Sequence, residues 1–290
     1  MQSIPNSELV LNPDGSVYHL NLLPEDLAPI VITVGDPDRV KDITKYFERI
    51  EVSKEHREFK TQTGSYMGTR ITVISTGIGT DNIDIVLNEL DALVNIDLES
   101  RTLKRAHTEL TFVRVGTSGA IQSHIPVGSF LISEMAIGFD NLLHYYKNTS
   151  FLDTAFSEAL VQQLGWGPPR SAPYVVAADE LLMQRFQASE FIKGNTATNV
   201  GFYGPQGRVL RLALNDHELI RKLQNFHWNG ASIDNMEMET SAIYGLARLL
   251  GHKAISLNAI LANRATGDFS ENPAEIVDAL IKKTLESLVV

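Results

Sequence analysis

Short apolar runs alternate along this chain with segments whose apolar residues recur every three or four positions. Such runs are typical of buried strands, and the longer period is typical of amphipathic helices. The runs predict buried strands at 30–34, 71–75, 111–115, 128–137 and 254–262. The helical spacing predicts helices over 38–50, around 83–93 and over about 273–288.

Strands that alternate with helices and short turns predict an α/β fold. We expect a mixed, mostly parallel central sheet flanked by helices. No stretch resembles a linker, so one domain over 1–290 is predicted, with a short N-terminal extension at 1–16. The polar segment 97–110, basic in its middle, is predicted to be a surface insertion.

The predicted strands end in glycine and arginine, which points to a ligand site. In open α/β sheets, ligands bind beyond the carboxyl ends of the strands. Glycine lets backbone N–H groups approach an anion, and arginine can donate two parallel hydrogen bonds to a phosphate. The strand ends in question are 35–39, 77–79, 114–119 and 263–264. We interpret 116–119 as a turn.

Arg114 is the most informative residue of this set. It lies inside the apolar run TFVRVG, and burying an unpaired guanidinium costs several kcal/mol. Its partner is therefore an anion, either a protein carboxylate or a bound phosphate. A nucleotide cofactor is not expected, because 77–79 lacks the third glycine of a dinucleotide fingerprint and no phosphate-loop lysine follows.

Two glutamates, Glu237 and Glu239, stand where the segment 235–247 turns helical. Carboxylates in a first turn offset the helix dipole, and a carboxylate can also hold a ligand. Residues two apart do not face each other on a helix, so a paired acid–base dyad is not expected. On an extended approach to the helix, the two side chains would share one side.

Composition narrows the class of partner. The 290 residues carry a formal net charge of −10, which disfavours nucleic acid and anionic membranes, because both bind basic patches. The absence of cysteine excludes disulfides and thiolate chemistry. Neither a secretory signal nor an apolar run of about 20 residues is seen, so we expect a cytoplasmic protein.

Motifs in order along the chain resemble the nucleoside phosphorylase superfamily, with its phosphorylase/hydrolase-like fold, and within it the uridine phosphorylases. The motifs are VYHL (17–20), VGDPDRV (34–40), HREF (56–59), STGIG (75–79), RVGTSGAIQSHIPVG (114–128), FYGPQGR (202–208), NMEMETSAIY (235–244) and ANR (262–264). The resemblance implies reversible phosphorolysis of uridine to uracil and ribose 1-phosphate, with phosphate as co-substrate and no required cofactor.

The resemblance also implies roles for individual residues. Phosphate is expected at Gly35, Arg39, Arg114 and Thr117, and at Arg57 of a neighbouring subunit. The ribose is expected at Met238 and Glu239, with His19 of the neighbour at its 5′-hydroxyl. The base is expected at Phe202, Gln206 and Arg208, between Ser118, Gly119 and Glu237, with Arg264 near the leaving base. Arg264, Arg114 and Glu239 are the expected catalytic residues.

Sharing residues between subunits implies a homodimer as the minimal active unit, with a hexamer as a larger assembly. Related enzymes bind a monovalent cation between subunits, which here implies a potassium site at Glu58, Ile78 and Asn82. Asn82 stands where serine is frequent, so a salt bridge or a helix cap is the alternative interpretation of these residues.

Two other functions stay open. One is a purine-directed phosphorylase or nucleosidase on the same fold. Such enzymes carry an acid just after the last core strand, whereas this chain has Asn263 and Arg264 there, with Asp268 further on. The other is a non-enzymatic nucleoside-binding relative, against which the retained phosphate arginines argue.

Overall fold

One 11-stranded sheet occupies the centre of the part that the computed structural model describes, residues 3–186 and 191–289. Its strands are β1 (Ile30–Val34), β2 (Arg49–His56), β3 (Phe59–Tyr66), β4 (Thr69–Ser75), β7 (Thr111–Ala120), β8 (Phe130–Gly138), β9 (Tyr174–Ala177), β10 (Phe191–Thr198), β13 (Asn235–Glu237), β14 (Lys253–Asn263) and β15 (Asp268–Phe269). Two hairpins lie outside it, β5 (Ile96–Asp97) with β6 (Thr102–Leu103) and β11 (His227–Trp228) with β12 (Ala231–Ser232).

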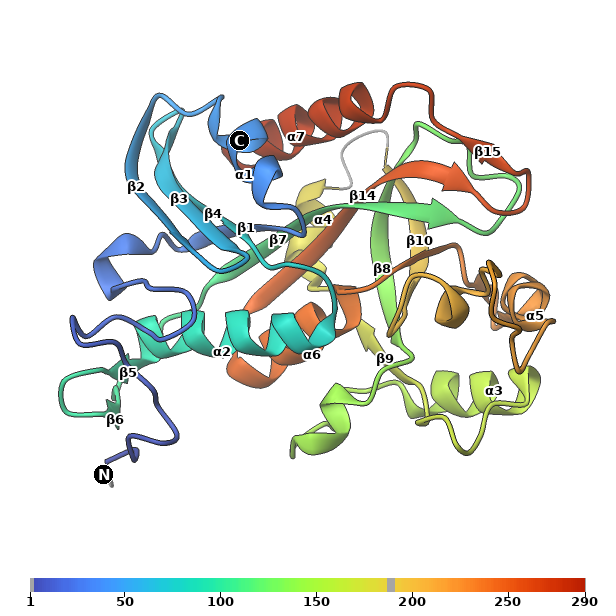
Figure 1. Ribbon diagram of the computed structural model, residues 1–290, viewed down its shortest axis with the longest axis horizontal. Coiled ribbons are helices and arrows are strands. Elements are labelled where there is room, and N and C mark those ends of the chain that lie inside the picture. The colour runs from blue at the N-terminus through green and yellow to red at the C-terminus, as the bar shows by residue number, and fades with distance from the viewer. Residues whose placement is uncertain (1–2, 187–190, 290) are drawn as a thin grey trace.

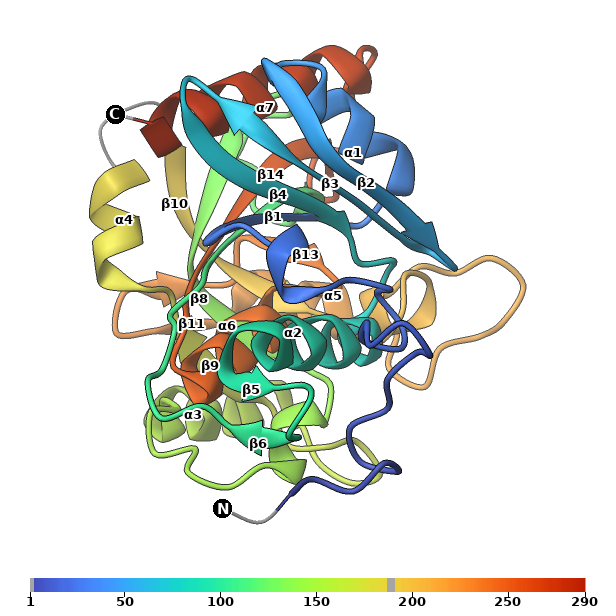
Figure 2. The same ribbon diagram turned by 90° about the vertical axis from the view of Figure 1, so that its left-hand side faces the viewer.

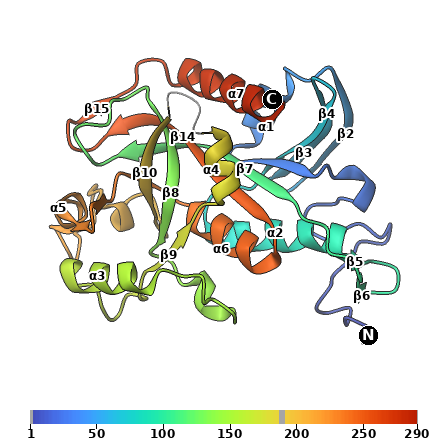
Figure 3. The ribbon, with the colours of Figure 1, turned by 180° about the vertical axis from the view of Figure 1, so that it is seen from behind.

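The sheet is mixed, as predicted, and part of it closes on itself. β14 pairs in parallel with β7 and antiparallel with β8; β8 continues through β10 and β13, and β13 returns to β7. Seen from behind, β8 and β10 run side by side (Figure 3). β1, β4, β3 and β2 extend from β7 as an open wing (Figure 1). The closure was not predicted, since it depends on which distant strands pair.

Helices cover both faces of the sheet. They are α1 (Pro37–Thr44), α2 (Thr80–Asn95), α3 (Thr154–Leu164), α4 (Glu180–Phe186), α5 (Leu219–Asn225), α6 (Thr240–Leu250) and α7 (Pro273–Val289). α2 and α6 pack side by side against one face, while α1 and α7 lie together on the other (Figures 1 and 2).

Hydrophobic periodicity predicts α2 well. The apolar residues expected on one helical face are all fully buried: Ile83, Val86, Leu87, Leu90 and Leu93. The helix predicted over 38–50 is wrong in its second half, because α1 ends at Thr44 and β2 begins at Arg49. Phe47 packs instead over Gly64 of β3, where a Cβ would lie 2.8 Å from its ring.

Segment 97–110 is a surface segment, as expected. Every residue from 97 to 109 is exposed or half-buried, and Leu110 is the first buried one. The segment contains β6 and the turn of the short hairpin that extends from the end of α2 (Figure 1). Within the described ranges, no helix has the length and apolar character needed to cross a membrane.

Candidate active site

A cavity of about 760 Å³ lies where β1, β4, β7 and β13 reach their carboxyl ends. This is the edge at which ligands gather in α/β sheets. The cavity brings together most of the expected site residues: Gly35, Arg39, Glu58, Ile78, Asn82, Arg114, Thr117, Ser118, Gly119, Phe202, Gln206, Arg208, Glu237, Met238 and Glu239. Three expected residues do not line it, namely His19, Arg57 and Arg264.

The absence of a side chain at Gly116 leaves room for the Arg114 guanidinium. A Cβ on this glycine would lie 1.9 Å from Arg114 Nη1, so any other residue would displace the side chain. The interpretation of 116–119 as a turn is wrong, since β7 continues to Ala120. The glycine serves the close approach of a side chain to the strand.

Arg114 is buried between two carboxylates. Its Nη2 donates to Glu239 Oε2 at 2.7 Å and lies 3.1 Å from Glu237 Oε2, while Nη1 donates to Asn258 Oδ1 at 2.9 Å. Burial opposes the charge, but the two carboxylates raise the pKa of Arg114 above its ordinary value. The sequence left open whether Arg114 pairs with a protein carboxylate or with a bound phosphate, and the structure shows protein carboxylates beside it.

Glu237 is fully engaged by the protein. It ends β13, and its Oε2 accepts hydrogen bonds from the N–H groups of Glu239 and Thr240, both at 2.9 Å, at the start of α6. Its Oε1 accepts from Thr198 Oγ1 at 2.6 Å. Glu237 is thus a helix-capping residue that also holds Arg114.

Glu239 keeps acceptor capacity. Its Oε1 accepts from Gly79 N at 3.0 Å, and Gly79 has a φ of +104°, which glycine adopts without strain. An ionised carboxylate offers about four acceptor sites, and the described residues use two of them, through Gly79 and Arg114. Burial raises the pKa of Glu239, and the charge of Arg114 opposes that rise. Both glutamates contact Arg114, as an extended approach to the helix predicts.

Arg39 differs from Arg114 in the partners of its guanidinium. Among the described residues this group makes no hydrogen bond or ion pair, although Arg39 lines the same cavity. Burial and then the charge of Arg114 lower the pKa of Arg39. A half-buried guanidinium beside a second one favours an anion at this wall of the cavity.

The opposite wall is a loop after β10. The Arg208 guanidinium carbon lies 3.8 Å from the centre of the Phe202 ring, and its Nη1 donates to Phe202 O at 2.6 Å and to Gln206 Oε1. Gln206 is buried, and within the described ranges its Nε2 has no hydrogen-bond partner. Arg264 Nη1 donates to Gln206 O at 3.0 Å, so Arg264 supports this loop from outside the cavity lining.

His19 and Arg57 lie elsewhere on this chain. His19 Nδ1 is 2.6 Å from Glu89 Oε1, and His56 Nδ1 is 2.9 Å from His19 O. Arg57, in the β2–β3 turn, lies over the Tyr18 ring at 5.5 Å. These residues form a small cluster that is separate from the cavity, so they do not complete the site within one chain.

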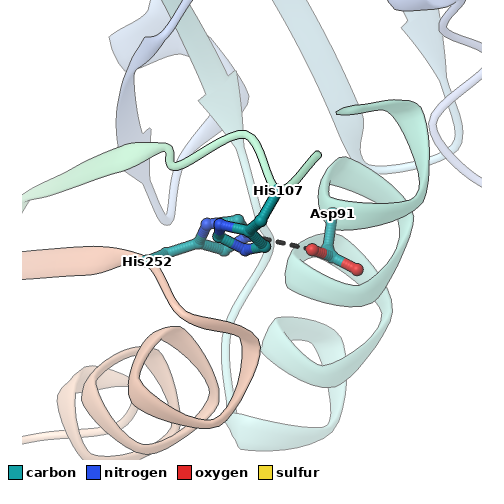
Figure 4. A group of neighbouring side chains, drawn as sticks. All are labelled: Asp91, His107 and His252. Carbon is teal, nitrogen blue, oxygen red and sulfur yellow. Dashed lines mark ion pairs between the residues drawn. The ribbon is translucent and has the colours of Figure 1, made fainter. Parts of the chain in front are cut away.

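Figure 4 shows another cluster, Asp91, His107 and His252, whose side chains are of types that bind metals; none of the three lines the cavity. Ligand atoms of Asp91, His107 and His252 lie within 4.8 Å of one another. However, His252 Nδ1 accepts a hydrogen bond from Leu110 N at 3.1 Å, so the neutral ring carries its hydrogen on Nε2, 3.1 Å from Asp91 Oδ1. That hydrogen occupies the position of a lone pair, so we interpret the cluster as structural.

Comparison with known proteins places the chain in a family. A family model described as "Phosphorylase superfamily" matches residues 29–289. The chain belongs to this superfamily. Among curated members it is 30% identical over 273 residues to the uridine phosphorylase of Thermococcus kodakarensis, covering 93% of this chain and 86% of the relative. It is 25% identical to the guanosine phosphorylase of Halorubrum lacusprofundi, covering 93% and 92%.

A solved superfamily structure has the same fold. The Trypanosoma brucei nucleoside phosphorylase, described as showing uridine phosphorylase activity, superposes with a TM-score of 0.88 at 30% identity. The match covers 97% of this chain and 99% of that one.

The structure adds residues to this superfamily site that the sequence analysis missed. Asn258 bonds to Arg114, and Thr198 bonds to Glu237. Asn258 interrupts the apolar run 254–262, which is the sequence signal that could have identified it.

Proposed function

We propose that this protein carries out the reversible phosphorolysis of pyrimidine nucleosides, with uridine and phosphate giving uracil and ribose 1-phosphate. One observation carries the proposal: Arg39, whose guanidinium makes no ion pair with the described residues, lines the same cavity as the Arg114–Glu239 pair. The relatives named as uridine phosphorylases support the choice of nucleoside.

Phosphate binds at the arginine wall. Arg39 supplies the unpaired charge, and Arg114 is held in place by Glu237, Glu239 and Asn258. Gly35 and Thr117 line the same wall. A guanidinium offers parallel donors that match a phosphate. A phosphate oxygen attacks C1′ while the bond from C1′ to the base breaks, and the base leaves with the bonding electrons.

The ribose binds at Glu239 and Met238. The acceptor sites of Glu239 that the described residues leave free suit the 2′- and 3′-hydroxyls, and hydrogen bonds to a charged group contribute roughly 1.5–3 kcal/mol each. The same negative charge stabilises a ribose that becomes positive at C1′ as the bond breaks.

The base binds at the loop wall. Gln206 is a buried residue of the cavity lining, and its Nε2 has no protein partner among the described residues, which suits a carbonyl oxygen of uracil. Arg208 and Arg264 place positive charge behind the departing uracil anion. That anion then takes a proton from water.

A purine-directed reaction has less support, because neither Glu237, next to the proposed base site, nor Asp268, after β14, offers a free carboxylate. The carboxylate of Glu237 is occupied on both oxygens. The Asn263 amide is bonded to the chain, donating to Gln122 O and Ile125 O and accepting from Ala265 N. Asp268 is exposed and bonded to Thr266 Oγ1.

We further propose that a second copy completes the site. His19 and Arg57 do not line the cavity of their own chain. In the proposed dimer, they bind the 5′-hydroxyl and the phosphate in the neighbouring subunit's site. The homodimer is then the minimal active unit, and the hexamer stays a prediction. The potassium site at Glu58, Ile78 and Asn82, and a cytoplasmic location, also stay predictions.

Incubation with nucleosides tests the proposed reaction. Uridine should yield uracil and ribose 1-phosphate with phosphate present, and no uracil with phosphate absent. Release of uracil without phosphate would identify a hydrolase. Faster turnover of inosine than of uridine would favour the purine-directed alternative.

Mixing inactive variants tests the shared site. Arg57→Ala and Arg114→Ala should each be inactive alone. After mixing and subunit exchange, a heterodimer has one site with both arginines intact, so part of the activity should return. If the mixture stays inactive although mass spectrometry shows that subunits have exchanged, the shared site is contradicted.

A further inference from the structure

A chain of buried hydrogen bonds links Arg114 to Ser118 through the closed part of the sheet. Arg114 Nη1 contacts Asn258 Oδ1 at 2.9 Å, and Asn258 Nδ2 contacts Ser133 Oγ at 3.1 Å. Ser133 Oγ lies 2.5 Å from Thr196 Oγ1. Thr196 Oγ1 lies 2.7 Å from Asn235 Oδ1, and Asn235 Nδ2 contacts Ser118 Oγ at 2.8 Å. We call this chain the Arg114–Ser118 relay.

Water cannot rearrange this relay. Its internal residues, Ser133, Thr196, Asn235 and Asn258, are completely buried, and Ser118 is 8% exposed. β7, β8, β10, β13 and β14 each contribute members. Burying a polar group without a partner destabilises the fold, so every member is held to its bonds.

The guanidinium sets the direction of the first half. Arginine only donates, so the Asn258 group facing it is the oxygen, and the Asn258 amide nitrogen faces Ser133. Ser133 Oγ therefore accepts from Asn258. A hydroxyl has one hydrogen. Among the described residues, Thr196 Oγ1 is the acceptor within reach of Ser133 Oγ, so we assign the Ser133 hydrogen to this bond.

The second half follows by the same rule. Thr196 accepts from Ser133, so its own hydrogen goes to Asn235 Oδ1. The Asn235 amide nitrogen then faces Ser118 Oγ, which accepts. The Ser118 hydrogen has no acceptor in the described part of the chain, and Ser118 lines the cavity.

We propose that the Arg114–Ser118 relay makes Ser118 an obligatory hydrogen-bond donor to the bound nucleoside, with Asn258 and Asn235 as positioning residues. Arg114, proposed to hold phosphate, thereby also fixes what the nucleoside side of the cavity offers. The identity of the ligand rests on the proposed function, whereas the direction of the relay does not.

Neutron diffraction from crystals of the deuterated protein tests the direction itself. We expect deuterons on the Asn235 nitrogen facing Ser118, and the Ser118 deuteron directed into the cavity. Asn235 oxygen facing Ser118, with the Ser118 deuteron pointing back to it, would overturn the relay. This outcome is separate from a failure to cleave uridine, because the map is read without substrate.

Kinetics test the consequence. Ser118→Ala should lower kcat/KM for uridine about tenfold and leave the KM for phosphate within twofold. Asn258→Asp turns the relay round, because a carboxylate accepts from Ser133. Thr196 then donates to Ser133, the Asn235 amide flips, and the Ser118 hydrogen is drawn back to Asn235 Oδ1.

The double variant separates the relay from a direct effect on Arg114. If Asn258→Asp acts through Ser118, combining it with Ser118→Ala should lower kcat/KM for uridine no further than Asn258→Asp alone. Multiplied losses would overturn the proposal, as would an unchanged kcat/KM in Ser118→Ala. Ser241→Ala removes a buried serine hydroxyl bonded to Asp140, outside the relay, and should keep kcat/KM within twofold.

Discussion

The two walls of the cavity are built differently. At the arginine wall, Arg114, Glu237 and Glu239 are buried to within a few per cent and bonded to strands and to the start of α6. At the loop wall, half of the Phe202 surface is exposed and Arg208 is fixed mainly within its own loop. Charges that must face a reaction centre are preorganised on the sheet, and the loop is free to vary.

This difference matches the distribution of substrates in the superfamily. Relatives at 25–30% identity include proteins named for uridine and for guanosine. Under the proposed function, the arginine wall binds phosphate and ribose and the loop binds the base, and such a division lets one fold serve several nucleosides. We therefore expect variants of the arginine wall to lose the reaction, and variants of the loop to change only its efficiency or specificity.

The largest effect is expected from Arg114→Ala. The variant leaves Glu237 and Glu239 buried without their cation, which costs about 3–5 kcal/mol of stability. kcat/KM should fall by about 10³-fold or more. Chemical denaturation and uridine kinetics measure the two losses. If the variant does not fold, Arg114→Lys retains the charge without the paired donors, and wild-type activity in it would contradict the account.

Arg39→Ala is the matched comparison on the same wall. Because the half-buried Arg39 guanidinium makes no ion pair with the described residues, its loss should change the free energy of unfolding by no more than about 0.5 kcal/mol. Phosphate binding, measured by calorimetry, should weaken at least tenfold. Strong destabilisation with unchanged phosphate affinity would mean that Arg39 is a structural residue.

On the loop wall, Gln206→Leu removes one proposed donor to uracil. The expected loss is about tenfold in kcat/KM for uridine, or ~1.4 kcal/mol, with stability little changed. Leu210→Ser, which alters an exposed residue of the same loop outside the cavity lining, should keep kcat/KM within twofold. Equal losses in both variants would indicate a general disturbance of the loop.

The smallest expected effect is a shift in pH dependence. Ribose hydroxyls need the ionised form of Glu239, and burial raises its pKa above the ordinary 4.5. Uridine affinity in phosphate-free buffer should therefore fall as the pH drops, with a midpoint above 4.5. Glu239→Gln cannot take up this proton and should lack the acid limb. If the uridine affinity of Glu239→Gln falls at low pH as it does in the unmodified protein, another titratable group causes the fall.

Hydrophobic periodicity predicted the elements whose burial follows from their own sequence. It failed where contacts with distant segments determine the secondary structure. α2 follows its apolar face closely, whereas Phe47 has helical spacing but packs over Gly64 on a strand. Gly116 resembled a turn because the sequence does not show that the Arg114 guanidinium lies over it.

The site residues also fall into two groups, those that the sequence predicted and those that only strand pairing brings to the site. The carboxylates that flank Arg114 could be found from their position before α6, and the cavity lining follows the motifs. The partners Asn258 and Thr198 come from strands whose pairing closes the sheet. The break in the apolar run marks Asn258 as unusual, but only the folded arrangement shows that Asn258 bonds to Arg114 and Thr198 to Glu237.

The central claim is that one inorganic phosphate binds between Arg39 and Arg114, next to the carboxylate of Glu239. A crystal structure of the protein soaked in phosphate tests it most directly. We predict a tetrahedral anion within hydrogen-bond distance of both guanidinium groups. A fully occupied phosphate elsewhere, with the space between these arginines filled by water alone, would contradict the account.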